Sequence, residues 1–273
     1  MSIKMIGLDL DGTALDPKGH FSDRVKEAFA AAMRQGIHIV IATGRPQSAL
    51  PKEIWQIEGL EYVMTANGSR IIRTVDDKPI YENYLEPSVV DRLREITEEN
   101  GLQAEIFVEG TAYIGRPEWD AIMAGKSFHR SKAYVSSTRT PVDDIYGWMT
   151  ENRTRIEDLV INYDTPEEKE AALALLKEVP DITITSAMRL NNEIGSATAS
   201  KANGLRQLME MLDVKREELM VCGDSPNDIA MIRFAGLGVA MGNALDSVKE
   251  AADAVTLSNA EDGVAVAIER YAL

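Results

Sequence analysis

The stretch Asp9-Leu10-Asp11-Gly12-Thr13 decides the fold, because it directly follows an apolar run, residues 3–8, that is too short for a convincing helix. Such a run suits a buried strand of a parallel sheet. Since side chains alternate along a strand, both aspartates are expected on one side, and the glycine allows the backbone to turn sharply. The pattern therefore predicts two carboxylates at the carboxyl edge of a sheet, where open α/β folds bind their ligands. An ordinary Asp-Gly turn that closes the strand is the alternative.

A second strand with polar residues at its end follows. Ser22 is suited to cap a helix over residues 23–35, and residues 37–42 form an apolar run that leads into Thr43-Gly44-Arg45-Pro46. Strand, helix and strand in this order predict a βαβ unit with parallel strands. A hydroxyl, a glycine and a cation at the end of the second strand are suited to hold an anion. A strand-to-helix turn with a surface arginine is the alternative.

A third short strand is expected over residues 62–65, and it ends close to Asn67-Gly68. A hairpin with arms at 70–74 and 78–82 follows it. The Asn-Gly pair either lines a site or serves only as turn chemistry, and the sequence does not separate the two.

The pattern changes near residue 85, where helices begin to alternate with hairpins, and this mixture indicates an α+β domain. We expect residues 85–191 to form a second domain inserted into the first, which comprises 1–84 and 192–273. Its expected elements are helices at 87–100, 141–151 and 166–177 and strands at 103–108, 112–114, 156–162, 182–185 and 188–191. Groups that read a substrate could be among Tyr113, Trp119, Phe128, His129, Arg130 and Lys132, although packing or a place on the surface is the alternative for each.

The last third of the chain returns to α/β signals. Ser200-Lys201 precedes an amphipathic helix, and residues 219–222 predict another buried strand. That strand opens into Gly223-Asp224-Ser225-Pro226-Asn227-Asp228. Two acids, an amide and a glycine at the carboxyl end of a strand repeat the chemistry of residues 9–13.

Composition limits the classes of protein that need to be considered. The 273 residues can bury a full core as one large domain or two smaller ones, and the net charge of −15 without a basic stretch argues against nucleic acid. Cys222 is the only cysteine, so an intramolecular disulfide is impossible. The N-terminus has no signal-peptide core, and no apolar run approaches the roughly 18 residues of a membrane span. We therefore expect a cytoplasmic protein, monomeric or homodimeric, that does not bind membranes.

Taken together, these motifs resemble the haloacid dehalogenase superfamily of phosphotransferases, and closely its Cof-type sugar-phosphate phosphatases with a C2B-type cap. The motifs stand in the family's order: residues 9–13, then Thr43-Gly44-Arg45, then Lys201, then residues 223–228. The stretches 239–244 (VAMGNA) and 261–265 (EDGVA) are also typical of that branch. The resemblance implies a Rossmann-like, doubly wound parallel sheet as the core domain and an inserted α+β cap that sets substrate specificity.

The resemblance also implies roles for single residues. Asp9 would be the nucleophile that forms an aspartyl-phosphate, and Asp11 would be the acid for the leaving alcohol and then the base for water. The transferring phosphoryl oxygens would be held by Thr43, the backbone amide of Gly44, Arg45, Lys201 and Asn227.

A cation is expected among these groups. Asp224 would ligate it together with Asp9 and the backbone carbonyl of Asp11, and Asp228 would support the metal without binding it. Like charges ~4 Å apart repel by about 4 kcal/mol at an effective dielectric near 20, so this cluster and a phosphate dianion require a cation. Since all candidate ligands are oxygens, and His20, His38 and His129 lie outside the motifs, Mg²⁺ is favoured over zinc.

Three functions remain open at this point. The first is a Mg²⁺-dependent phosphomonoester hydrolase that acts on a small phosphorylated metabolite. The second is a phosphomutase of similar architecture, which would pass the phosphoryl group to a sugar. The third is a slow regulatory protein that senses a phosphorylated ligand through its cap, although a pure sensor would not need Asp11.

Overall fold

A computed structural model describes residues 2–126, 131–186 and 188–273. Phe128, His129 and Arg130, which we considered as possible substrate-reading groups, lie outside the described residues. The chain forms two compact units: the first comprises Met1–Gly44, Pro51–Tyr81 and Ser200–Leu273, and the second comprises Arg45–Leu50 and Glu82–Ala199.

The first unit contains a mostly parallel sheet with the strand order β14-β13-β12-β1-β2-β3-β4-β5. Its strands are β1 (Met5–Leu8), β2 (His38–Ala42), β3 (Tyr62–Thr65), β4 (Arg70–Arg73), β5 (Lys78–Glu82), β12 (Leu219–Gly223), β13 (Leu237–Ala240) and β14 (Ala254–Val255). β1 lies in parallel between β12 and β2, and β3 pairs in parallel with β2 and antiparallel with β4. This arrangement confirms the expected α/β class and brings the carboxyl ends of β12, β1, β2 and β3 to one edge.

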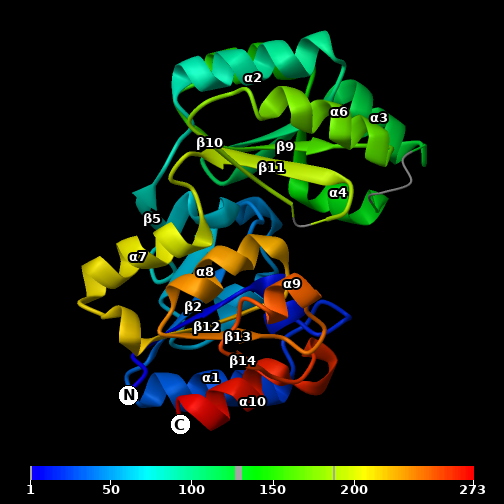
Figure 1. The fold of residues 1–273 in the computed structure, drawn as a ribbon. Coiled ribbons are helices and arrows are strands. Elements are labelled where there is room, and N and C mark those ends of the chain that lie inside the picture. Colours follow the sequence, from blue (N-terminus) through cyan, green and yellow to red (C-terminus); the bar gives the residue numbers. More distant parts are fainter. Residues whose placement is uncertain (1, 127–130, 187) are drawn as a thin grey trace. The chain divides into compact units, whose positions relative to one another are not determined.

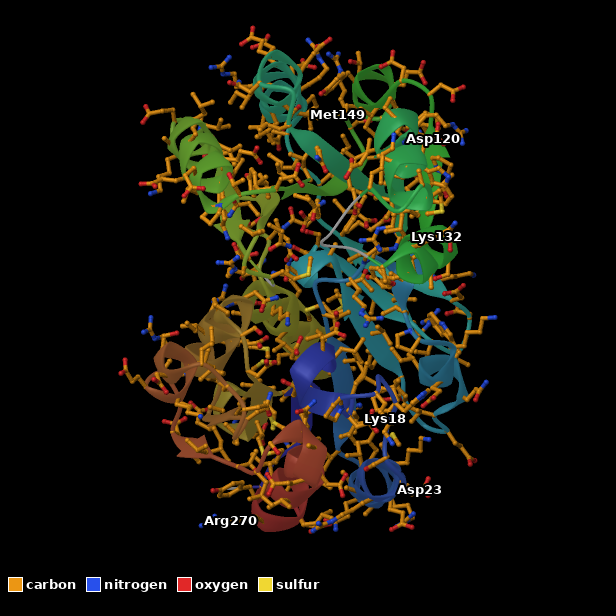
Figure 2. All side chains as sticks on the ribbon, turned by 90° about the vertical axis from the view of Figure 1, so that its right-hand side faces the viewer. Lys18, Asp23, Asp120, Lys132, Met149 and Arg270 are labelled. Carbon is orange, nitrogen blue, oxygen red and sulfur yellow. The ribbon has the colours of Figure 1, made fainter. Side chains whose placement is uncertain are left out.

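Helices cover both faces of this sheet, which explains why the central strands are apolar at nearly every position. The helices of the first unit are α1 (Asp23–Arg34), α7 (Lys201–Leu212), α8 (Ile229–Phe234), α9 (Asp246–Lys249) and α10 (Gly263–Tyr271). α1 and α10 lie on one face, and α7 and α8 on the other (Figure 1). Ser22 caps α1 as expected, since its side chain accepts a hydrogen bond from the Val25 amide. Asp23 and Arg270, at the ends of α1 and α10, lie on the outer surface (Figure 2).

The second unit is α+β, with a mixed sheet in the order β10-β11-β9-β6-β7-β8. Its strands are β6 (Gln103–Val108), β7 (Thr111–Gly115), β8 (Arg139–Val142), β9 (Ile156–Asn162), β10 (Ile182–Thr185) and β11 (Asn191–Ser196). Its helices are α2 (Pro87–Glu99), α3 (Arg116–Met123), α4 (Lys132–Thr138), α5 (Ile145–Glu151) and α6 (Pro166–Leu176). One apolar core joins α2, α5 and α6 to the sheet, and a smaller cluster joins α3 and α4 to β7.

Several expectations for this unit need correction. The helix expected over 141–151 begins only at Ile145, because Asp144 caps it and the preceding residues form β8. β8 is an edge strand, where Pro141 is tolerated. The strand expected over 188–191 begins at Asn191 instead. Residues 192–199, which we expected in the first domain, belong to the second unit because β11 pairs with β9 and β10.

Three of the cap residues singled out in the sequence have packing partners within the second unit. The Tyr113 ring lies 4.9 Å from that of Trp148, and Trp119 packs in the small cluster of α3 and α4. Lys132, at the start of α4 (Figure 2), donates a hydrogen bond to the Met123 carbonyl at 2.9 Å. Among the described residues, no helix is both long and apolar enough to cross a membrane.

Candidate active site

The nucleophile candidate Asp9 stands at the carboxyl end of β1, where the strand gives way to a tight turn. Its backbone amide still donates to the Cys222 carbonyl on β12 at 3.0 Å, which holds the residue against the neighbouring strand. The Asp9 side chain is buried, whereas Asp11 is exposed within the turn Leu10–Ala14. β1 ends at Leu8, so Asp11 lies in the turn and not on the strand, and the expectation that both acids project to one side stays a prediction.

The turn after Asp9 depends on Gly12, whose φ of 78° lies in the left-handed region. A Cβ atom at this position would lie 2.6 Å from Oδ2 of Asp224, so a larger residue would strain the turn and displace the Asp224 carboxylate. The next residue, Thr13, donates its hydroxyl to Oδ1 of Asp224 at 3.0 Å. Residues 12 and 13 therefore bring the loop after β1 against the loop after β12.

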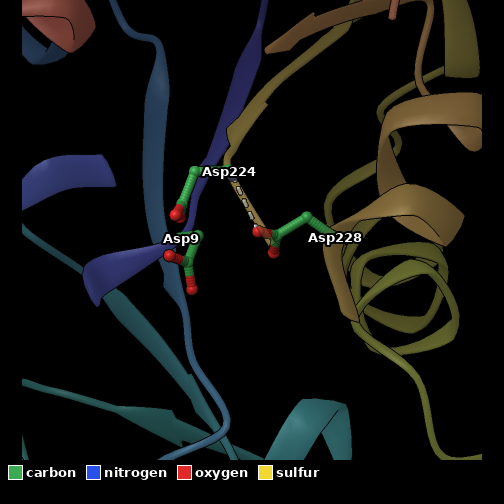
Figure 3. Close-up of side chains that lie close together, drawn as sticks. All are labelled: Asp9, Asp224 and Asp228. Carbon is green, nitrogen blue, oxygen red and sulfur yellow. Dashed lines mark hydrogen bonds between the residues drawn. The ribbon is translucent and has the colours of Figure 1, made fainter. Parts of the chain in front are cut away.

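Three carboxylates converge at this edge of the sheet. Asp9, Asp224 and Asp228 each offer an oxygen atom within 4.8 Å of the others, the one such group that could hold a metal among the described residues (Figure 3). Oδ2 of Asp228 accepts hydrogen bonds from the backbone amides of Asp224 and Ser225, both at 2.9 Å. Since that oxygen is already engaged, Asp228 is better placed to orient the loop of Asp224 than to act as a principal ligand.

Lys201 supplies the cation of the cluster. Its side chain is fully buried at the start of α7, and its Nζ donates to Oδ1 of Asp9 at 2.5 Å and to Oδ1 of Asp228 at 2.7 Å. Burial alone would lower the pKa of Lys201, but the charges of Asp228 and Asp9 and the hydrogen bonds to them raise it above its ordinary value. Lys201 therefore stays charged and fixes one oxygen of Asp9.

One ammonium group does not balance three carboxylates. Burial first, and then the charge of Asp228, raise the pKa of Asp9 well above its usual range, although Lys201 opposes the shift. The same two causes raise the pKa of Asp224. A divalent cation next to Asp9 and Asp224 would reverse both shifts, and an all-oxygen donor set suits Mg²⁺. The residues present therefore fit the metal that the sequence predicts.

The three candidate residues after β2 belong to different units: Thr43 and Gly44 to the first and Arg45 to the second. Thr43 is buried and anchored in the first unit, because its amide donates to the Met64 carbonyl on β3 at 2.9 Å. Gly44 is the last residue of that segment. Arg45 belongs to the second unit, where its guanidinium donates to the Ala49 carbonyl at 2.9 Å and lies 5.8 Å from the centre of the Tyr134 ring. A phosphate-binding role for Arg45 stays a prediction.

The side chain of Asn227 contacts Asn67, a residue for which the sequence left open a place in a site or a role in a turn. It lies in the short turn Pro226–Asp228 after β12, and its Nδ2 donates to Oδ1 of Asn67 at 3.0 Å, with both side chains buried. The Asn-Gly pair at the end of β3 indicated Asn67 as a candidate. The Asn67 side chain contacts the loop that carries Asp224 and Asp228.

Two further asparagines bind the backbone of the turn after Asp9, and they were not identified from the sequence as site residues. Nδ2 of Asn243 donates to the Gly12 carbonyl at 2.8 Å, and Nδ2 of Asn259 donates to the Leu15 carbonyl at 2.8 Å. The Asn259 amide in turn donates to Oδ1 of Asn243 at 2.9 Å. Asn243 lies in the stretch 239–244 that is typical of the Cof-type branch, so the motif was visible in the sequence but its partner was not.

The mostly parallel sheet, with helices on both faces and an acid and lysine cluster at its carboxyl edge, defines the class of α/β hydrolases, and the comparisons give the family. The model of the haloacid dehalogenase-like hydrolases matches residues 6–268, and the chain belongs to this family. Within it, the chain is a Cof-type phosphatase.

The individual relatives are similar over almost the whole chain. A 5-amino-6-(5-phospho-D-ribitylamino)uracil phosphatase of Bacillus subtilis is 31% identical over 280 residues, covering 100% of this chain and 97% of the relative. The structure of a haloacid dehalogenase-like hydrolase from B. subtilis has a TM-score of 0.85 at 28% identity, covering 98% and 100% of the two chains. The HAD subclass IIB sugar phosphatase BT4131 has a TM-score of 0.83 at 26% identity, covering 98% of each chain.

Proposed function

We propose that this phosphatase is a Mg²⁺-dependent phosphomonoester hydrolase that acts on small phosphorylated metabolites, with sugar phosphates as the leading substrate class. The observation that carries the proposal is the position of Lys201, which binds Oδ1 of Asp9 and so leaves the other oxygen of the same carboxylate to attack phosphorus. A lysine that holds an acid only for stability would not need Asp224 within reach of the same carboxylate.

The reaction proceeds in two displacements at phosphorus. In the first, a carboxylate oxygen of Asp9 bonds to phosphorus while the bond to the ester oxygen breaks, and Asp11 donates its proton to that leaving oxygen. In the second, Asp11 takes a proton from water, the water oxygen bonds to phosphorus, and the bond to Asp9 breaks. The exposure of Asp11 suits this role, since it must reach both a leaving alcohol and water.

Charge on the phosphoryl oxygens is offset by groups around Asp9. Lys201, Thr43, the amide of Gly44 and Asn227 are proposed to contact these oxygens, with Arg45 as a further candidate. Asp9, the carbonyl of Asp11 and Asp224 would hold Mg²⁺, with Asp228 in support. When bound, the metal neutralises the carboxylates and the phosphate dianion so that the two can approach each other.

The names of two relatives favour one substrate class. One is a phosphatase of a phosphoribityl compound and the other is a sugar phosphatase. Both names describe a phosphate ester on a polyhydroxylated carbon chain. We propose that the second unit, as the inserted cap, binds the part of the substrate away from phosphate and excludes water during the first displacement.

The test is phosphate release from a panel of sugar phosphates, polyol phosphates, nucleotides and phosphorylated cofactors, with Mg²⁺ and with a chelator. Asp9→Asn removes the nucleophile and should abolish release, whereas Asp23→Asn, the same change at an exposed position, should leave it intact. Slow release with strong activation by a bisphosphorylated sugar would select the phosphomutase alternative. Binding of phosphorylated ligands without release under any metal condition would select the sensor.

A further inference from the structure

The turn Ala66–Gly68 after β3 contacts all three loops that carry candidate phosphate-binding residues. The Asn67 amide donates to the Thr43 carbonyl at 3.0 Å, and its side chain accepts from Asn227. Gly68 packs against the start of α7, where a Cβ atom would lie 2.3 Å from the Ser200 carbonyl oxygen and 3.2 Å from the Lys201 nitrogen. The turn thus joins the ends of β2 and β12 and the beginning of α7.

The backbone of this turn adopts a conformation that most residues avoid. Ala66 and Asn67 have φ values of 47° and 52°, both in the left-handed region. Asparagine enters that region more readily than other residues with a side chain, whereas alanine has no local hydrogen bond to offset the strain. Two such residues in succession, both buried, indicate that the surrounding contacts hold the turn in one conformation.

The side chain of Asn67 determines which way the Asn227 carboxamide faces. A carboxamide presents two N–H groups at one end and an oxygen at the other, so rotating it by half a turn exchanges a donor for an acceptor. The bond from Nδ2 of Asn227 to Oδ1 of Asn67 selects one of these orientations and uses one N–H group. A second N–H group of the same nitrogen is then fixed in direction, and a donor is what an anionic phosphoryl oxygen requires.

We propose that Asn67 is a positioning residue that acts through Asn227, holding its carboxamide with an N–H group directed at the transferring phosphoryl group. The inference rests on the proposed function, since it assigns a purpose to Asn227 in that reaction. Asn67 also ties the carbonyl of Thr43 to the same turn, so the groups after β2 and β12 keep their separation when substrate binds.

A double-mutant cycle tests this assignment. Asn67→Gly removes the carboxamide but suits the left-handed backbone, and it should lower kcat/KM by about tenfold, the expected effect of losing one oriented hydrogen bond to a charged group. Asn227→Ala should lower kcat/KM by at least as much. The double variant should match Asn227→Ala within about twofold, because Asn67 acts through that side chain. Additive losses in the double variant would overturn the proposal.

A matched control and a spectroscopic readout separate positioning from a general loss of structure. Asp213→Gly makes the same kind of change at an exposed left-handed residue with a φ of 52° and should keep full activity. In nitrogen-edited NMR spectra of the uniformly labelled protein, the Asn227 side-chain amide, assigned by its absence in Asn227→Ala, should shift in Asn67→Gly. An Asn227 signal that does not move would also overturn the proposal.

The same variants distinguish failure of this inference from failure of the proposed function. If the wild type releases no phosphate from any ester, the proposed function fails. The NMR comparison and calorimetric titration with inorganic phosphate then decide the role of Asn67 without turnover. Weaker phosphate binding in Asn67→Gly, equal to that in Asn227→Ala, supports the positioning role, and unchanged binding contradicts it.

Discussion

At the scale of single residues, Lys201 is the side chain on which the charge balance of the carboxylate cluster depends and, in the proposed function, the orientation of the nucleophile. It is fully buried and binds two buried carboxylates. A buried charge that loses its partner is much more costly than the same charge in water. The residue therefore serves the stability of the first unit and the orientation of Asp9 at once.

Lys201→Met should abolish phosphate release and lower the free energy of unfolding by about 3–5 kcal/mol, because it leaves Asp9 and Asp228 without their cation. Urea unfolding and phosphate release measure the two effects. Lys18→Met, the same change at an exposed lysine, is the control and should alter neither (Figure 2). Adding Asp228→Asn to Lys201→Met should recover part of the stability and none of the activity; unchanged stability in Lys201→Met would contradict this account.

Glu118 in the second unit gives a pH dependence with a defined sign. Burial and, to a lesser extent, the charge of Asp164 raise its pKa to about 8, although Arg139 opposes the shift. Between the ordinary pKa of a glutamate, about 4.3, and this value the folded protein retains a proton that the unfolded chain releases. The free energy of unfolding should therefore fall as the pH rises through this window.

Urea unfolding at pH 6 and pH 9 measures this contribution. Glu118→Gln, which cannot ionise, should lose less stability than the wild type between the two pH values. Glu109→Gln, the same change at an exposed glutamate, is the control and should follow the wild type. Parallel curves for wild type and Glu118→Gln would show that the carboxyl is already ionised at pH 6 in the folded protein.

At the scale of elements, the turn Leu10–Ala14 is held from outside by residues more than 200 positions away. Asn243→Ala removes the bond to the Gly12 carbonyl and should lower kcat/KM by about tenfold. Stability should change by only about 0.5–1.5 kcal/mol, since water can replace a bond made by an exposed side chain. Asn100→Ala also removes a bond from Nδ2 to a backbone carbonyl, that of Ile96, and should leave activity unchanged. Equal kcat/KM values in Asn243→Ala and wild type would show that the turn holds its shape without this bond.

The elements also show where the sequence was sufficient and where it was not. β1, β2 and β12 were predicted because buried parallel strands are continuous apolar runs followed by polar residues, and this pattern is local. β8, α3 and α4 were missed because they are short, and their few apolar residues, such as Ile122 and Val135, become recognisable only when they pack on Ile114.

The site was predictable in its residue types and only partly in its geometry. Asp9, Asp224 and Lys201 meet as the motif order implied. The exposure of Asp11, the two backbone amides that bind Asp228 and the hydrogen bonds from Asn243 and Asn259 to the turn depend on turns and on contacts between distant segments. No local pattern in the sequence encodes such contacts.

At the scale of the whole molecule, metal binding should couple to folding, because Asp9 and Asp224 come from opposite ends of the chain. A Mg²⁺ ion held by both residues, as proposed, would bind the folded state alone, so Mg²⁺ should raise the melting temperature in a concentration-dependent way, with about 2.7 kcal/mol gained at 100 times Kd. A chelator should remove the gain. Differential scanning calorimetry measures this effect.

Asp224→Asn tests the same metal site in the opposite direction, through a loss of the response to Mg²⁺. Without metal it relieves repulsion in the cluster, so it should be at least as stable as the wild type, but it should gain little when Mg²⁺ is added. Asp23→Asn, at the surface, should respond to Mg²⁺ like the wild type. A melting temperature of wild type that is insensitive to Mg²⁺ would argue against a metal site between these two loops.

The position of β1 between β2 and β12 has a consequence for biosynthesis. β1 and β2 leave the ribosome early in synthesis, whereas β12, which flanks β1 on its other side, begins only at Leu219. Until then the nascent chain carries β1, an apolar strand, with one unpaired edge that can join strands of other molecules. Asp9 meanwhile stays in water, away from Lys201 and Asp224. The protein therefore completes its proposed active site and pairs the exposed edge of β1 in the same late step of synthesis.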